Sequence, residues 1–348
     1  WWKILNFAAK TQEDFLITAK VVSLQGTPQL SPSSKDAEGK LIIPIVYSLD
    51  LQITDPVGPM NAGTSTPLRV SVINIGNRQT GKIFPKKDKI KKRYDLIINL
   101  AAIVGGREVI EYNPLAVAED LEIDTSFWRW ILKAKPLHVI TYSSSAAYPI
   151  SLQTRDNYRL LKESDISFQS GVFGMPDMSY GWSKLTHEYL GKLAHDKYGL
   201  NVVTYRPFSG YGIDQDDTYP FPIICKRALK NKGNERLYVW GTGRQMRDFI
   251  HIDDCVEGVL KTMDKINNGD AINLSTGLYT SFIEFAELAA KGCGYSPIVS
   301  GKTTKPSGVY ARAGDTIKQN VLGFTYKVDL ERGINEALQY YDKIIWSF

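Results

Sequence analysis

A tyrosine and a lysine four positions apart, Tyr180 and Lys184, have types and spacing that suggest chemistry. They fall in a stretch predicted to be helical from Ser179 to Tyr198, which stops at Gly199. Residues four apart share one face of a helix, so the phenol and the ammonium should lie one turn from each other. A neighbouring cation favours the phenolate form, which lets a tyrosine act as a base near neutral pH. The alternative is an ordinary surface pair, because the chain has 19 tyrosines and the pattern also arises by chance.

A run of three serines, Ser143 to Ser145, follows a predicted strand from His138 to Tyr142. Ligands of open α/β sheets bind at the carboxyl ends of the strands, so this run is a second candidate for the site. A serine hydroxyl there could hold a substrate oxygen while Tyr180 exchanges its proton. The alternative is a turn in which a serine side chain only caps the strand end.

The elements that must position these residues alternate between buried strands and amphipathic helices from residue 94 onward. Strands are predicted at residues 94–102, 138–142 and 201–206, and helices at 113–135 and 179–198. This pattern predicts an α/β fold, a Rossmann-like doubly wound parallel sheet. We expect residues 1–212 to form this cofactor-binding domain.

Beyond Gly212 the pattern is mixed and predicts a smaller α/β domain, residues 213–348, that mainly binds substrate. Strands are expected at 237–240 and 271–274, and helices at 253–265, 282–291 and 330–345. Residues 1–93 are atypical, because Ser, Pro, Thr and Gly interrupt every apolar run. Strands are still expected there at 20–24, 42–49 and 68–75.

The composition of the chain limits which classes of ligand and which cellular compartment are expected. The 348 residues carry 42 Lys and Arg against 37 Asp and Glu, a net charge of +5. This excess is too mild to indicate nucleic acid, whereas a polyanionic small molecule fits. Three widely spaced cysteines favour a reducing compartment and argue against zinc or disulfide frameworks, and we expect no metal. Apolar runs are too short for a membrane helix, so a cytoplasmic location is expected.

Taken in order, four motifs resemble the extended short-chain dehydrogenase/reductase family, the nucleotide-sugar epimerases and dehydratases. They are Asn99 to Ala102, Ser143 to Pro149, the Tyr180/Lys184 pair and Arg206 to Gly212. The resemblance implies NAD or NADP as cofactor and a homodimer formed by the helices that contain Trp128 and Tyr180. It implies catalytic roles for Ser144, Tyr180 and Lys184. It implies cofactor contacts from Asn99, Ala101, Ala102, Ser143, Tyr180, Lys184 and Pro207, and substrate contacts from Ser145, Phe208 and Ser209.

Two further motifs continue the resemblance in the second half of the chain. The segment from Trp240 to Asp254 contains Arg247, and Arg312 opens the sequence Arg-Ala-Gly-Asp. In the family such arginines bind the diphosphate of a nucleotide-diphosphate sugar, and guanidinium groups suit that role because they make bidentate, charge-assisted bonds. Ordinary surface ion pairs are the alternative.

The chain departs from the family at the glycine-rich turn that normally holds the cofactor pyrophosphate. By spacing, the nearest equivalents are Gly26 and, for the acid that binds the ribose, Asp50, but Pro28 and Pro32 disrupt the helix that should follow. A catalytically retired protein that keeps the fold and binds a nucleotide sugar or a protein partner is therefore the alternative to an enzyme.

The residue at position 146 discriminates between reactions. Dehydratases of the family place an acidic pair at residues 145 and 146, where this chain has Ser145 and Ala146. GDP-mannose 3,5-epimerases, which the chain resembles around Asn99 to Gly106 and Cys225, place a cysteine at Ala146. Since alanine cannot move protons, we expect a 4-epimerase that acts through a transient keto sugar. A keto-reductase or a dehydratase is the second alternative.

Overall fold

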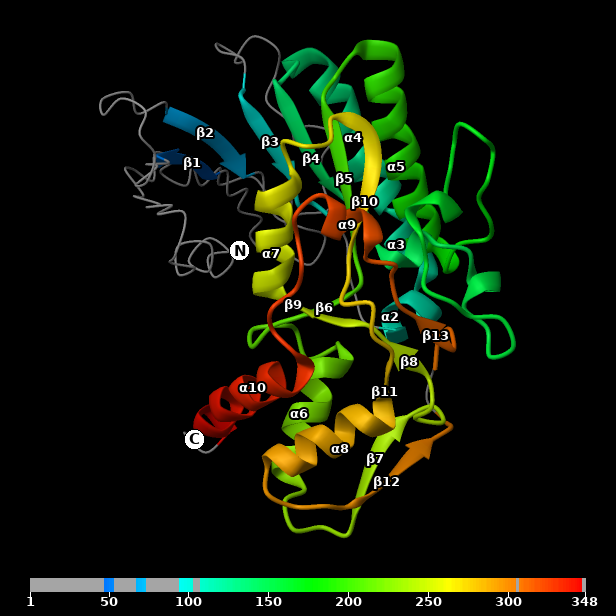
Figure 1. The fold of residues 1–348 in the computed structure, drawn as a ribbon, viewed down its shortest axis with the longest axis vertical. Helices are drawn as coiled ribbons and strands as arrows, with labels where there is room; N and C mark the ends of the chain where they lie inside the picture. The colour runs from blue at the N-terminus through cyan, green and yellow to red at the C-terminus, as the bar shows by residue number, and fades with distance from the viewer. Residues whose placement is uncertain (1–46, 53–66, 73–93, 103–106, 305–306, 346–348) are drawn as a thin grey trace, which may run out of the picture.

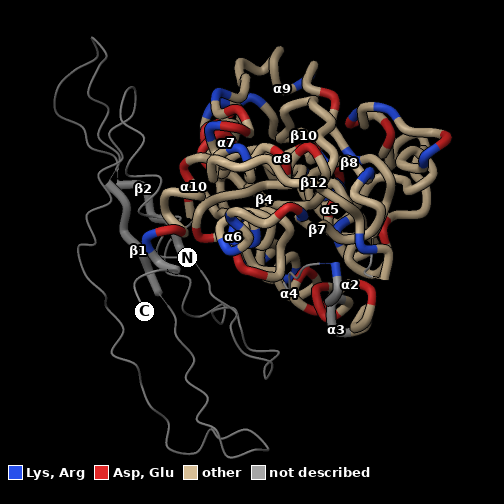
Figure 2. The backbone as a smooth tube through the Cα atoms, turned by 90° about the horizontal axis from the view of Figure 1, so that it is seen from below, with Lys and Arg blue, Asp and Glu red and all other residues tan. Residues whose placement is uncertain are grey.

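The computed structural model describes residues 47–52, 67–72, 94–102, 107–304 and 307–345. Figure 1 shows these residues arranged as an upper part built on a parallel sheet and a lower part rich in helices. In the described part, acidic and basic residues are interspersed along the chain (Figure 2).

The sheet of the upper part has four parallel strands in the order β10-β5-β4-β3. They are β3 (Leu96–Asn99), β4 (His138–Tyr142), β5 (Val202–Pro207) and β10 (Asn268–Leu274). The first five residues of β5 are all buried, as expected for a parallel strand covered on both faces. These strands confirm the predicted α/β class.

Helices cover both faces of this sheet (Figure 1). On one face, α4 (Asp120–Ala134) and α5 (Met178–Tyr198) pack against the side chains of Ile97, Val139 and Val202. On the other face, α7 (Ile252–Thr262) packs against Leu96, Ile140 and Val203. Successive strand residues therefore face opposite layers, which gives the doubly wound arrangement.

A buried ion pair ties α5 to the sheet. The Arg206 guanidinium of β5 donates to both carboxylate oxygens of Glu188 of α5, at 2.9 and 2.6 Å. Arg206 also donates to the hydroxyl of Tyr148, which in turn donates to Asn273 of β10. The network fixes the helix that carries Tyr180 and Lys184 relative to the strand ends.

The lower part packs three helices around one apolar core: α6 (Pro220–Lys230), α8 (Phe282–Gly292) and α10 (Leu330–Ile345). Three small sheets border it. Their strands are β6 (Ser209–Tyr211) with β9 (Phe249–His251), β7 (Arg236–Trp240) with β12 (Ile298–Lys302), and β8 (Met246–Arg247) between β11 (Thr280–Ser281) and β13 (Ala311–Arg312).

The residues that follow the predicted boundary at residue 212 do not all belong to the lower part. After β6 and β9, the chain returns to the upper part, where α7 covers the first sheet and β10 pairs with β5. The strand predicted at 271–274 thus belongs to the sheet of the upper part, and its apolar side chains join Ile140 and Val203 in one core.

Short helices complete the upper part. The helix predicted at 113–135 is split into α3 (Pro114–Ala118) and α4, and α2 (Arg107–Tyr112) precedes them. The last short helix is α9 (Ile317–Val321). Proline at the first position of α3 fits its missing N–H donor.

Within residues 1–93, the described part consists of two strands. These are β1 (Tyr47–Gln52) and β2 (Pro67–Val72), which pair antiparallel. In a dinucleotide-binding unit the turn joins a strand to a helix, and the next strand runs parallel to the first, so this antiparallel pairing differs from the expected pattern. Asp50 lies within β1 opposite Arg69, not after the end of a strand, and Gly26 lies outside the described residues.

Candidate functional site

Tyr180 and Lys184 lie on one face of α5 at its amino end, as predicted. The Lys184 ammonium is 5.5 Å from the centroid of the Tyr180 ring. Lys184 is only 3% exposed, whereas Tyr180 is partly exposed. The phenol can therefore be reached from outside while the cation beside it is enclosed.

Two acidic residues of α4 lie near this buried ammonium group and favour its charged form. The Nζ atom of Lys184 lies 3.5 Å from Oδ2 of Asp120, which is itself 1% exposed. Burial opposes the charge, but Tyr180, Asp120 and Asp124 outweigh it, and the pKa of Lys184 is raised. Sequence reasoning missed both acids. A usable signal was present, because they are spaced i, i+4 on the otherwise apolar face of a predicted helix.

The serine run leads into a short 3-10 helix after β4, η2 (Ser145–Ala147), whose N-cap is Ser144. The Ser144 hydroxyl oxygen accepts the N–H of Ala146 at 3.1 Å, so the capping alternative describes one of its contacts. Its own proton remains available to donate to a ligand. Ser145 is buried.

A close backbone approach joins α5 to this serine turn. The N–H of Asp177 donates to the carbonyl of Ala146 at 2.9 Å. A Cβ added at Gly181 would lie 2.4 Å from the same carbonyl oxygen. Only glycine allows the tyrosine helix to dock here, so the Tyr-Gly pair places Tyr180 next to the Ser144 turn.

Five further predicted cofactor contacts lie at the carboxyl ends of neighbouring strands. Asn99 ends β3 and accepts the N–H of Ala101 at 3.2 Å, and Ala102 follows, partly exposed. Ser143 follows β4, and Pro207 ends β5. The parallel sheet therefore brings these predicted residues to one edge.

Polar side chains at this edge suit the nicotinamide end of a dinucleotide. Among the described residues, the buried Ser143 hydroxyl oxygen has no hydrogen-bond partner, which is unusual for an enclosed polar atom. Lys184 supplies a donor next to Tyr180. Asn99, Ser143 and Lys184 would hold the cofactor there.

The predicted substrate residues after β5 are placed differently from one another. The Phe208 ring is buried beside Tyr148, with ring centroids 6.1 Å apart, so it contributes shape and no polar contact. Ser209 is partly exposed and opens β6, and its N–H donates to the carbonyl of Asp248.

The two predicted arginines are neighbours. Arg312 of β13 stands opposite Arg247 of β8 in the parallel ladder. Burial first, and then the like charge of Arg312, lower the pKa of Arg247 to about 9. Burial also lowers the pKa of Arg312. Holding both charges together costs free energy, which an anionic ligand would offset.

Residues of the upper part orient Arg312. Its Nε donates to Gln153 at 2.5 Å, and its Nη2 donates to Asp177 at 2.8 Å. Asp177 precedes Tyr180 by three positions, so the arginine pair lies close to the amino end of the tyrosine helix. Nothing in the sequence pattern singled out Asp177 or Gln153, because their roles depend on contacts with a distant strand.

A buried carboxylate holds the segment that carries Arg312. Asp248, fully buried, accepts hydrogen bonds from the N–H groups of Thr276, Gly277 and Gly314 and from the Ser275 hydroxyl. Burial raises the pKa of Asp248 although these bonds oppose the shift. Since Asp248 follows Arg247 directly, it fixes both arginine strands.

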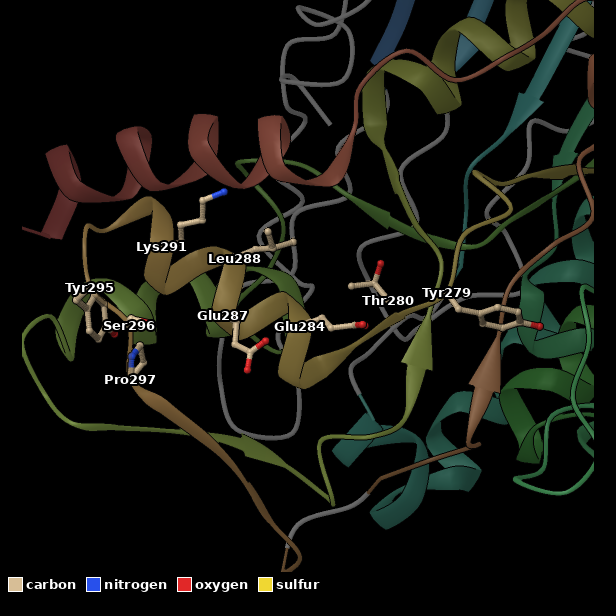
Figure 3. Close-up of a pocket in the computed structure, with 9 residues that line it drawn as sticks. All are labelled: Tyr279, Thr280, Glu284, Glu287, Leu288, Lys291, Tyr295, Ser296 and Pro297. Atoms are coloured by element: carbon tan, nitrogen blue, oxygen red, sulfur yellow. The ribbon is translucent and has the colours of Figure 1, made fainter.

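A separate open pocket lies along α8 in the lower part (Figure 3). Its lining includes the acids Glu284 and Glu287 with the single cation Lys291. None of the predicted site residues lines it, and two carboxylates make it unsuitable for a diphosphate.

Two kinds of feature are absent from the described residues. No helix in this part of the chain combines the length and apolar character needed to cross a bilayer. No group of three or more His, Cys, Asp or Glu side chains in these ranges could hold a metal ion.

The chain is similar to proteins of known activity. The chain is 25% identical over 254 residues to a probable GDP-L-fucose synthase 1 from Oryza sativa subsp. japonica, covering 70% of this chain and 75% of the relative. It is 28% identical to GDP-mannose 3,5-epimerase from Arabidopsis thaliana over 58% of this chain, which is about half of that relative (52%).

A solved structure shares the fold. The UDP-glucose 4-epimerase of Thermotoga maritima superposes with a TM-score of 0.63 and 22% identity, covering 77% of this chain and 84% of that one. The predicted Rossmann-like fold is thereby confirmed. Residues 78–275, more than half of the chain, match the family described as "NAD dependent epimerase/dehydratase family". The expected family is confirmed: this chain belongs to the NAD dependent epimerase/dehydratase family.

Proposed function

We propose that the protein is an NAD(P)-dependent nucleotide-sugar epimerase that acts at C4 of the sugar. The observation that carries the proposal is the position of Asp177, which bonds Arg312 at 2.8 Å and stands three residues before Tyr180. A candidate base and a candidate diphosphate site therefore meet at one end of α5. The 4-epimerases and GDP-sugar enzymes among the similar proteins support the same class.

In the proposed reaction, Tyr180 removes the proton of the C4 hydroxyl, and the Ser144 hydroxyl holds the same oxygen. Lys184 keeps a positive charge beside the phenol because Asp120 and Asp124 stabilise it. NAD or NADP, when bound, supplies reversible hydride transfer. Tyr180 then returns the proton once the sugar has been reduced on its other face.

The diphosphate has to be held while the keto sugar turns. Arg247 and Arg312 would grip it, since adjacent guanidinium groups bind phosphate oxygens strongly. Ser145, Phe208 and Ser209 would border the sugar. Ala146 lies buried in η2 and offers no acid or base, which favours chemistry that needs only Tyr180 and hydride transfer.

Turnover of UDP- and GDP-sugars, followed by proton NMR of the C4 epimers, tests this proposal. We expect product from the wild type and a loss of at least about a thousandfold in Tyr180→Phe, because the base is removed. Tyr198→Phe, an exposed tyrosine at the end of the same helix, is the matched control. Product formation by Tyr180→Phe at the wild-type rate would reject the assignment.

The antiparallel pairing of β1 with β2 favours the second candidate, a retired enzyme that binds a nucleotide sugar without a cofactor. Mass spectrometry of the denatured, purified protein separates the two. Released NAD(P), or a thermal shift on adding it, supports the enzyme. The absence of both results supports the binding protein.

The proposal extends to assembly and location. Three exposed apolar side chains on α4 and α5 support a homodimer through these helices: Leu121 (38% exposed), Trp182 (42%) and Tyr189 (45%). Trp128 instead packs in the core. Light scattering would test the dimer. All three cysteines are free and buried, which supports a cytoplasmic location that cell fractionation would test.

A further inference from the structure

A third arginine, Arg107 of α2, reaches the two arginines of the proposed diphosphate site. Gly308 lies between them: a Cβ added there would be 3.1 Å from Nη2 of Arg247 and 3.3 Å from Nε of Arg107. These arginines come from chain segments more than 60 residues apart, and α2, β8 and β13 gather at the junction of the two parts (Figure 1).

Asp177 is the carboxylate shared within this cluster. Arg107 Nη1 donates to its two oxygens at 2.9 and 3.0 Å, and Arg312 Nη2 donates to Oδ2 at 2.8 Å. Arg107 also pairs with Glu111 at 2.6 Å. Burial alone would raise the pKa of Asp177, but Arg312 and Arg107 outweigh it and hold that pKa below its ordinary value.

Arg247 is bonded differently. Within the described residues, its guanidinium donates to the backbone carbonyls of Met246, Val309 and Ser307 and lies over the ring of Phe282. The cluster thus holds three guanidinium groups and two carboxylates, and both carboxylates pair with Arg107. One of the three guanidinium groups, that of Arg247, bonds to neutral acceptors. The positive charges of the cluster outnumber its carboxylates by one, so an anion can bind there without making its net charge strongly negative.

We propose that Arg107 is the third arginine of the diphosphate site and that Asp177 is its resident carboxylate, which competes with the ligand for the same guanidinium groups. This inference rests on the proposed function, since it concerns the diphosphate of that substrate. Arg107 strengthens binding by adding a donor fork and a positive charge. Asp177 weakens binding, because it occupies donors of Arg107 and Arg312 and repels the phosphates.

Arg107 and Asp177, which are in direct contact, are therefore predicted to have opposite effects on the affinity for the diphosphate. Isothermal titration with UDP and GDP on the full chain measures them. We expect Arg107→Gln to weaken binding by about tenfold, the effect of one charge-assisted contact, and Asp177→Asn to tighten it by several-fold. Arg129→Gln, which removes an exposed arginine of α4, is the matched control and should bind as the wild type does.

A purely structural role would weaken binding in both variants, and that result would overturn the inference. Unchanged binding by Arg107→Gln would overturn it as well. Asp177→Ser is a second neutral variant, expected to tighten binding if Asp177→Asn does not fold. If the wild type binds neither nucleotide, the diphosphate site itself fails, and with it the proposed function. If the wild type binds a nucleotide but the Asp177 variants bind it more weakly than the wild type does, only this inference fails.

Discussion

Lys184 and Asp120 form an ion pair between two helices that lie side by side, with Nζ 3.5 Å from Oδ2 and both side chains almost fully buried. The pair joins α5, which carries the candidate base, to α4. Asp124, one turn further along α4, adds a second buried carboxylate to this layer, and its Oδ1 lies 2.8 Å from Nδ1 of His187. The chemistry and the packing of these helices thus share the same groups.

Replacing Asp120 by Asn should destabilise the protein, because a buried ammonium loses its partner. We expect a loss of about 3 kcal/mol, at the lower end for a broken buried pair, since Asp124 remains nearby. Urea unfolding measures the change. Glu122→Gln, on the exposed side of the same helix, is the control and should change stability by less than about 0.5 kcal/mol. Equal stability of the two variants would contradict the pairing.

Asp177 should make stability depend on pH in a defined direction. Its pKa is lowered in the folded protein, so its ion pairs contribute stability above its ordinary pKa of 3.8. That contribution is lost as pH falls through the lower folded value. We expect wild type to exceed Asp177→Asn by about 2 kcal/mol from pH 8 to 5, and the difference to shrink below pH 4. A difference that grows on acidification would contradict this assignment.

The sequence predicted the parts of the site that depend on local pattern. Helical spacing placed Tyr180 and Lys184 on one face, and Gly199 ends α5 in a left-handed conformation, as predicted. The serine turn after β4 was also placed correctly, because a buried strand followed by small polar residues has few alternatives. The predicted arginines are neighbours in the ladder of β8 and β13.

The parts that depend on long-range contacts could not be predicted from the sequence. Arg107 and Asp177 carry no local signal, because their partner Arg312 lies more than 130 positions beyond Asp177 in the chain. The return of β10 to the first sheet was missed for the same reason, since an apolar strand fits either sheet until its neighbours are known. Asp50 was expected after a strand and lies inside β1.

Gly181→Ala tests the docking of α5 on the serine turn. Its methyl group would lie 2.4 Å from the Ala146 carbonyl oxygen, so the helix end must shift away from Ser144. We expect a loss of about 2 kcal/mol in stability, typical of overpacking, and a larger loss of turnover. Gly210→Ala, whose added methyl group meets nothing closer than 3.8 Å, controls for the stability change. Full stability of Gly181→Ala would show that this approach is not tight.

Arg247→Met tests whether the arginines of the diphosphate site destabilise the protein when no ligand is bound. The pKa of Arg247 is lowered to about 9 by burial and by Arg312, so removing its charge relieves repulsion. Met supplies an apolar, polarizable side chain that can contact the Phe282 ring, over which the Arg247 guanidinium lies. We expect the melting temperature without ligand to stay at or above that of wild type. The thermal shift produced by saturating UDP or GDP should fall sharply, because ligand stabilisation follows affinity. A variant that melts several degrees lower yet keeps the full ligand shift would mean that Arg247 serves the fold and not the diphosphate.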